Sequence, residues 1–390
     1  MRSKFVNYID IKAPLTCMLL VLGVYPNVSS KSLLVRQTFT SYRLFIAALL
    51  VTFALLVANS DLLKVNFPQN ALTRSGFWIQ YCSRLILAAY ILVLLVRKRE
   101  LIAEVHDELA NIQKNWPPRI HPGHTILAKL VLAASLFVAL LTTPIMIVLD
   151  AYSDPKNNIC VLWCAHLPGL IIHCYVTYMS FMKFQGAQLF DDLNHYFNLI
   201  RERLAIKMQQ SVNESWNHRQ DCICELHKMF KMHFRLTKVI KKLHSIYSNE
   251  YLLLVNLTMH GIILLTYIII LDLLRFRGQL GLYPREHYFT EYWILVEILD
   301  IGFIIISAHE LNVNGGRECP LMHFITKIYK NVDDCISLYS FQLLVSKVST
   351  SAAGILNIEY STLFLILGTA LKYVFIILQF DASTNGRKCM

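Results

Sequence analysis

Two carboxylates stand in an apolar part of the chain, where ionisable side chains are costly. Glu297 and Asp300 lie three residues apart in the run 292–308, so a helix would place them on one face. Ionisable groups in such runs form structural ion pairs or take part in binding sites, and Arg84 is a candidate ion-pair partner. The alternative is a binding pocket with aromatic walls and a few polar groups. Its candidate residues are Tyr81, Trp163, His166, Tyr267, Trp293, Glu297 and Asp300, with Thr142, Thr143 and Asp272 as further polar neighbours.

Motifs for enzymatic chemistry are absent from the sequence. It contains no phosphate-binding glycine loop, no Gly-x-Ser-x-Gly, no His-Glu-x-x-His and no dinucleotide fingerprint. Potential metal ligands occur in the run 160–182, but on one helix they point in several directions and lack the spacing of a metal site. They are Cys160, Cys164, His166, His173 and Cys174. The sequence therefore predicts neither an enzyme nor a bound metal or other cofactor.

The composition is that of a membrane protein. Of 390 residues, 55% are hydrophobic and only 16% are charged, whereas soluble domains carry about 25% charged residues. The net charge of +11 is expected near the cytoplasmic ends of membrane helices rather than against a nucleic acid. A transmembrane helix needs about 20 apolar residues. Seven runs approach this length: 42–60, 76–96, 126–149, 160–182, 251–274, 292–308 and 362–380. We therefore predict an all-α membrane protein with seven transmembrane helices in a single domain, 1–390.

Basic residues indicate on which side of the membrane each helix end lies. Arg97-Lys98-Arg99 follows the second run and favours a cytoplasmic location for that end. With seven spans, the N-terminus then lies inside and the C-terminus outside, and segments 183–250 and 320–347 are cytoplasmic helices.

In 183–250 apolar residues recur in steps of three and four, which predicts that the fourth and fifth spans continue as amphipathic helices. These helices are either exposed to water or packed against other subunits. These residues are Leu189, Leu193, Phe197, Ile200 and Leu204, then Leu236, Ile240, Leu243 and Tyr247.

The last apolar run ends in a motif. It reads Lys372-Tyr373-Val374-Phe375-Ile376-Ile377-Leu378-Gln379-Phe380, which is a polar-aromatic pair, five apolar residues and a Gln-Phe pair. It is preceded by Phe341-Gln342-Leu343-Leu344, by the stretch from Val348 to Gly354, and by Leu363-Phe364 and Gly368. This block resembles the closing motif of the insect gustatory receptors, which are related to insect odorant receptors. The motif positions are Tyr373, Gln379, Phe380 and Gly354, and Lys372 stands in place of the family's Thr.

The resemblance implies a gustatory, chemosensory receptor that acts as a ligand-gated, non-selective cation channel. In that family four subunits assemble through a cytoplasmic anchor, here 183–250 with 320–347, and the last helix, here 362–380, lines the pore. Four copies of Ile376 and Phe380 would close the pore by excluding water, and four Gln379 amides would face passing cations. The implied setting is the plasma membrane of sensory neurons. The implied partners are a small-molecule tastant, membrane lipid, and copies of this chain or other gustatory receptors in a homo- or heterotetramer.

The ligand class is indicated by one position of the motif. Val374 stands where sugar-receptor relatives often carry Glu, which favours a bitter or aversive compound, or a contact pheromone, over a sugar.

Lys372 needs an explanation in this picture, because four lysines around one pore would repel cations. A charged residue in mid-membrane also costs roughly 2.5–3.5 kcal/mol unless it meets water or a partner. Three explanations are open. Lys372 could lie in a wide inner vestibule, pair with a carboxylate such as Glu359, or occur in a heteromer that holds fewer copies.

Two other classes of membrane protein fit less well. A G-protein-coupled receptor would have the opposite orientation, and the third and last runs lack an Asp-Arg-Tyr-like end and an Asn-Pro-x-x-Tyr motif. A transporter would show repeated halves or helices broken in mid-span. Only Pro144 and Pro168-Gly169 hint at such breaks.

Overall fold

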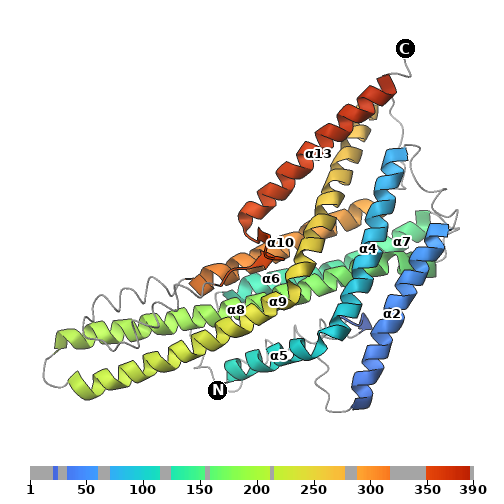
Figure 1. Ribbon diagram of the computed structural model, residues 1–390. Coiled ribbons are helices and arrows are strands. Elements are labelled where there is room, and N and C mark those ends of the chain that lie inside the picture. The colour runs from blue at the N-terminus through green and yellow to red at the C-terminus, as the bar shows by residue number, and fades with distance from the viewer. Residues whose placement is uncertain are drawn as a thin grey trace.

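The computed structural model describes most of the chain as helices (Figure 1). The described residues are 21–24, 33–59, 71–114, 124–153, 159–210, 215–276, 288–316 and 348–386. The predicted cytoplasmic helix 320–347 lies outside these residues.

As far as their residues are described, each of the seven predicted apolar runs falls in one of these helices or in a closely linked group of them. The first five helices are α2 (Leu33–Asn59), α4 (Ala71–Arg97), α5 (Arg99–Lys114), α6 (His124–Phe137) and α7 (Thr143–Ser153). The other four are α8 (Ile159–Gln210), α9 (Ser215–Phe276), α10 (Tyr288–Gly316) and α13 (Tyr360–Gly386). A π-helical turn, η1 (Val138–Thr142), joins α6 to α7, so the third apolar run is α6, η1 and α7 together. The all-α class is therefore confirmed.

Three helices in the described parts of the chain are long and apolar enough, by length and composition, to cross a membrane. Their apolar portions are Trp78–Arg97, Cys224–Ile270 and Tyr360–Phe380, and Ala133–Leu149 is a shorter apolar helix. The number of spans and the orientation of the chain stay predictions.

Two helices are much longer than a membrane is thick. With 52 and 62 residues, α8 and α9 extend over about 80 and 90 Å at 1.5 Å per residue, whereas the hydrocarbon core is about 30 Å. They lie side by side, and the end of α8 and the start of α9 extend beyond the other helices (Figure 1). Both predicted stripes are buried where their side chains are described, from Leu189 to Ile200 and from Leu236 to Tyr247. The prediction that the fourth and fifth runs continue as amphipathic helices is thus confirmed. Helix α8 also continues through Pro168.

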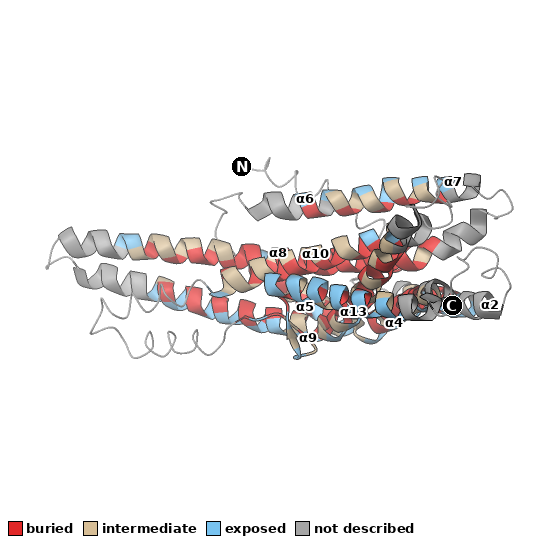
Figure 2. Cartoon of the chain, turned by 90° about the horizontal axis from the view of Figure 1, so that it is seen from above, coloured by how far each residue is buried: buried red, intermediate tan, exposed pale blue. Residues whose placement is uncertain are grey.

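The core lies where α4, α8, α9 and α10 meet, and Figure 2 shows its buried residues concentrated along α8, α9 and α10. Close approach depends on small residues. A Cβ atom added to Gly186 of α8 would lie 2.5 Å from Cδ1 of Ile240 on α9. Aromatic side chains fill the centre, where Tyr175 and Tyr247 meet edge to face with ring centroids 5.9 Å apart.

A short β-hairpin precedes α13. Strands β1 (Ser351–Ala352) and β2 (Leu356–Asn357) pair antiparallel, with Ser351 opposite Asn357. The turn places two residues in the left-handed region, Ala353 with φ 52° and Gly354 with φ 72°. Hairpin turns with two positive φ angles match the twist of the strands and favour glycine. This gives a physical reason for the glycine at motif position Gly354.

The hairpin is bound to two other helices. The Ala353 amide donates to the Ser248 carbonyl of α9 at 2.9 Å, and the Ser351 amide donates to Nε2 of His244, also on α9, at 3.1 Å. The Thr350 hydroxyl donates to Oδ1 of Asn312 on α10 at 2.9 Å. The start of α13 is therefore held to both α9 and α10.

Candidate functional site

Arg84 and Glu297 form the ion pair that the sequence left open. Nε of Arg84 on α4 lies 2.5 Å from Oε1 of Glu297 on α10, and the two side chains are 4% and 6% exposed. The second oxygen, Oε2, accepts from Nε2 of Gln80 at 2.7 Å. Both carboxylate oxygens thus have donors, which buried charge requires.

The same network reaches α9. Oε1 of Gln80 lies 2.6 Å from Nδ1 of His260, which therefore donates its proton to the amide oxygen. A Cβ atom at Gly261 would lie 2.9 Å from Oε2 of Glu297 and 3.0 Å from Nε2 of Gln80. A glycine at 261 leaves the space in which the polar groups of α4, α9 and α10 meet.

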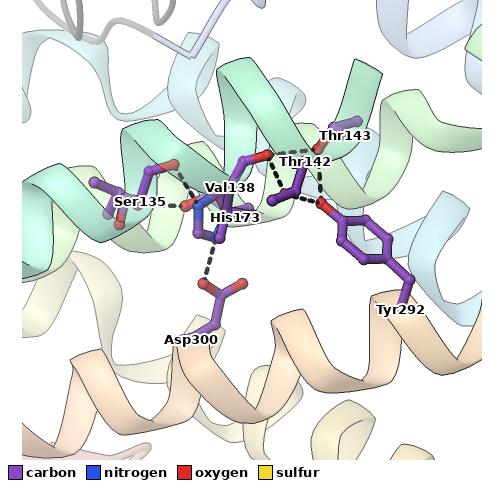
Figure 3. Close-up of polar contacts among 8 residues, drawn as sticks. Ser135, Val138, Thr142, Thr143, His173, Tyr292 and Asp300 are labelled. Carbon is purple, nitrogen blue, oxygen red and sulfur yellow. Dashed lines mark hydrogen bonds and ion pairs between the residues drawn. The ribbon is translucent and has the colours of Figure 1, made fainter. Parts of the chain in front are cut away.

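Asp300 forms a second buried pair with a different helix. Its Oδ1 lies 2.6 Å from Nδ1 of His173 on α8, and Nε2 of His173 lies 3.2 Å from the Ser135 carbonyl of α6 (Figure 3). A backbone carbonyl only accepts, so Nε2 must carry a proton. The remaining proton is shared between Nδ1 and the carboxyl group, and the pair is neutral overall wherever that proton resides. A neutral pair is what an apolar surrounding favours.

Glu297 and Asp300 therefore bind in two directions, although both lie on α10. Glu297 binds Gln80 and Arg84 of α4 and lies against Gly261 of α9, whereas Asp300 binds His173 of α8, which in turn contacts α6. Both carboxylates are used within the chain, as the ion-pair interpretation requires. Their part in a ligand pocket stays a prediction.

The π-helical turn in the third run forms a polar cluster with Tyr292 of α10. The Val138 carbonyl accepts from the hydroxyls of Thr142 at 2.7 Å and Thr143 at 3.0 Å, and each hydroxyl oxygen lies 2.9 Å from the Tyr292 hydroxyl (Figure 3). Pro144 follows directly; it has no N–H for a helical hydrogen bond, and its ring crowds the preceding turn. The backbone accommodates Pro144 by forming the wider π-helical turn before it. Such π-turns are frequent at functional sites.

His166 and Trp293, both predicted pocket residues, are in contact. Nε1 of Trp293 donates to Nδ1 of His166 at 3.0 Å, and both side chains are buried. The ring of Tyr292 meets that of Trp293 nearly at right angles, with centroids 5.1 Å apart. Trp293 rests directly on Gly169, where an added Cβ atom would lie 2.4 Å from the indole ring.

The other predicted pocket residues are spread over α4, α8 and α9. Tyr267 is buried and Tyr81 is half-buried against the core. The side chains of Trp163 and Asp272 lie outside the described residues. The structure thus brings His166 and Trp293 together, with Tyr292 beside them, and it separates Glu297 from Asp300.

The Gly169 contact gives a testable consequence. Replacing Gly169 by Ala is expected to lower the free energy of unfolding by roughly 1–3 kcal/mol, because the new methyl group must displace a large, fully packed ring. The measurement is the thermal unfolding of the detergent-solubilised protein. Gly302→Ala is the matched control, since a Cβ atom there meets nothing within 4 Å and alanine favours a helix more than glycine does. Equal midpoints for the two variants would contradict the predicted clash.

Several contributors to these clusters were not predicted. Gln80 lies four residues before Arg84, so a polar stripe at helical spacing could have indicated it. Tyr292 and His260 are single polar residues in apolar runs and carry a weaker signal. Ser135 acts through its carbonyl, for which the sequence has no signal.

A lysine beyond the predicted fourth span is also buried. Nζ of Lys183 lies 4.0 Å from the ring centroid of Tyr251 on α9, a cation–π geometry. Burial away from water lowers the pKa of Lys183 to about 7.

The exposed face of α13 holds the predicted pore residues. Thr362, Ile366, Ala370 and Val374 form the stripe that packs against the chain, each at most 3% exposed. Lys372 and Gln379 project from the opposite side and are exposed. Ile376 is 37% exposed, and Phe380 is 69% exposed. The side chain of Tyr373, a motif position, is 48% exposed.

Comparison with known proteins places this arrangement in a family. The family model described as 7tm Chemosensory receptor matches residues 14–384. Among solved structures, the insect olfactory receptor OR5 from Machilis hrabei is similar with a TM-score of 0.65 and 11% identity, covering 97% of this chain and 100% of that one. The same receptor in complex with eugenol gives a TM-score of 0.58 and 12% identity, with 96% and 100% covered. No curated protein sequence matches this chain.

At such low identity the two receptor structures show the fold alone, whereas the family model covers nearly the whole chain. The resemblance of the closing motif to insect gustatory receptors and their odorant-receptor relatives is confirmed at this level. The chain therefore belongs to the 7tm chemosensory receptor family.

Proposed function

We propose that this chain is a subunit of a ligand-gated, non-selective cation channel that detects a small-molecule tastant. The observation that carries the proposal is the exposed face of α13. This helix has an apolar portion of 21 residues, yet Lys372 and Gln379 project from it on the side opposite its buried stripe. A lysine facing lipid in mid-membrane is strongly disfavoured, so this face is expected to meet water and other subunits.

A ring of α13 helices would satisfy that requirement. Four copies, one from each subunit of a homo- or heterotetramer, would enclose a pore with Lys372 and Gln379 in contact with water. Ile376 and Phe380 lie about one turn and two turns beyond Lys372. Their apolar side chains would then form a constriction that closes by excluding water, and the Gln379 amides would offer carbonyl oxygens to cations.

The geometry of α13 also weighs on the three explanations for Lys372. Glu359 lies 13 residues before Lys372 along the chain and just before the helix begins, which separates the two by about 20 Å along the helix axis. In a symmetric ring the neighbouring Glu359 lies at the same level, so pairing with it is disfavoured between subunits too. A wide vestibule filled with water and a heteromer with fewer lysines are therefore favoured over pairing with Glu359.

The predicted ligand pocket is supported by chemistry in the chain and by a relative. The olfactory receptor OR5 from Machilis hrabei is solved in complex with eugenol. In this chain the aromatic group of His166, Tyr292 and Trp293 lies beside the hydroxyls of Thr142 and Thr143, which suits a small molecule with apolar and hydrogen-bonding parts. We propose a bitter or aversive compound or a contact pheromone as the ligand class. Val374 is 2% exposed, so a sugar-receptor Glu there would be buried.

The proposed location is the plasma membrane of sensory neurons, with the N-terminus inside and the C-terminus outside. Ligand binding shifts the channel toward the open state only by its greater affinity for that state. The cytoplasmic portions of α8 and α9, with 320–347, are proposed to hold the subunits together.

Orientation is the sharpest test, because a G-protein-coupled receptor would have the opposite one. An epitope tag after Met390 and a second tag at Met1 are stained in intact and permeabilised cells. We expect the C-terminal tag to be stained on intact cells and the N-terminal tag only after permeabilisation. The reverse pattern would overturn the channel proposal and favour a G-protein-coupled receptor.

A further inference from the structure

The only charged residue between Tyr360 and Phe380 is Lys372. It lies on the side of α13 that is turned away from the rest of the chain, about 6 Å before Ile376 along the helix axis. Within the parts of the chain that the structure describes, it forms no ion pair. Between Tyr360 and Phe380, the fixed charge that one copy of this chain brings to the proposed pore is therefore positive.

That charge is additive over the subunits around the pore. Consider an ion on the axis, about 5 Å from each ammonium group, in water at physiological salt. Coulomb repulsion with screening lowers the local occupancy of a monovalent cation roughly twofold for one lysine and roughly twentyfold for four. The occupancy of chloride rises by the same factors. Rings of basic side chains are a known basis of anion selectivity in pores.

We propose that Lys372 determines whether the channel passes cations or anions, according to how many copies of this chain surround the pore. Four copies make a pore that prefers chloride, so the cation channel proposed above is then a heteromer with fewer lysines at this position. One copy among three subunits without a charge at this position leaves a pore that passes cations at a reduced rate. The inference rests on the proposed function, because it needs α13 to line a pore.

The ligand is unidentified, so the test uses channels that open without one. In the background Ile376→Ser with Phe380→Ser, the chain is expressed alone and the reversal potential is recorded under a NaCl gradient. With Lys372 present we expect a permeability ratio of sodium to chloride below one. With Lys372→Thr we expect the ratio to rise at least tenfold and to exceed one.

A matched control separates pore charge from total charge. In the background above, Lys372→Thr is combined with Leu371→Lys, which keeps one lysine per subunit at the same depth. Neighbouring positions on a helix point about 100° apart, so the new lysine leaves the pore axis. We expect this variant to keep the cation preference of Lys372→Thr. A return to chloride preference would show that position around the helix does not matter and would overturn the inference.

Copy number is tested by linking two subunits in one polypeptide, one with Lys372 and one with Lys372→Thr. The linker contains an added transmembrane helix, because the C-terminus of the first subunit is expected outside and the N-terminus of the second inside. Such pairs place two lysines in a tetramer, and we expect an intermediate permeability ratio. Currents with the same ratio in all these channels would overturn the inference and leave the channel proposal intact. If tagged protein reaches the cell surface and no variant carries current, both the channel proposal and the inference fail.

Discussion

Replacing both Ile376 and Phe380 by Ser is expected to produce a channel that conducts without ligand, with a resting current at least tenfold above that of the unaltered chain. Both side chains are exposed on the free side of α13, Ile376 at 37% and Phe380 at 69%. An apolar constriction closes a pore because water is unstable next to apolar side chains. Exposing one large apolar side chain to water costs roughly 1.5–3 kcal/mol of free energy. Four copies of two serines remove most of that barrier.

The control for this prediction keeps the number of apolar-to-polar changes on the same helix. Phe364 and Leu371 are 73% and 51% exposed, but they lie on another side of α13. Phe364→Ser with Leu371→Ser should leave the resting current unchanged. The measurement is whole-cell current without ligand, normalised to the amount of tagged protein at the surface. Equal resting currents in the two double variants would place the constriction elsewhere.

The second large effect concerns the buried ion pair. Glu297→Ala is expected to lower the free energy of unfolding by roughly 3–5 kcal/mol, because it leaves the Arg84 guanidinium buried without its carboxylate. The Gln80 amide loses its shorter hydrogen bond as well and keeps only the Leu257 carbonyl as an acceptor, at 3.4 Å. The expected observation is a large fall in the thermal midpoint of the detergent-solubilised protein and in the amount that reaches the cell surface.

Two further variants distinguish the stability lost with the ion pair from the stability lost with side-chain volume. The double variant Arg84→Met with Glu297→Met removes both charges and retains much of the volume, so it should recover most of the lost stability. Glu104→Ala is the surface control. Its carboxylate lies 2.5 Å from Nζ of Lys242, but the two side chains are 53% and 27% exposed, and such pairs contribute at most about 1 kcal/mol. A Glu297→Ala midpoint equal to that of Glu104→Ala would show that the buried pair does not stabilise the fold.

Much of the fold could be predicted because its signals are local. Hydrophobic runs and three-to-four spacing placed the apolar segments in helices and predicted the continuation of α8 and α9, whose stripes from Leu189 and from Leu236 are buried. The ion pair between Arg84 and Glu297 was one of two alternatives, since two opposite charges in apolar runs have few other partners. The hairpin before α13 was not predicted, because strands of two residues have no measurable period.

The site was predicted less well because its bonds depend on register between helices. Nothing in the spacing of Glu297 and Asp300 indicates that one faces Gln80 and the other His173. The Ser135 carbonyl contacts His173 because of the way α6 packs on α8, and the threonine hydroxyls contact Tyr292 at the end of a π-turn that lies just before Pro144. These are properties of packing and backbone geometry. They are determined only when α6, α8 and α10 pack together in the folded chain.

The hairpin that holds the start of α13 to α9 and α10 makes that helix a lever with a fixed base. Its first residue, Tyr360, is also in ring contact with His309 of α10, with centroids 4.2 Å apart. Ile376 lies 16 residues further on, about 24 Å from this base. A tilt of about 5° would therefore move Ile376 by about 2 Å while the base hardly moves. Small rearrangements of the buried clusters would thus be amplified along α13, and the largest displacement would fall at the residues proposed to close the pore.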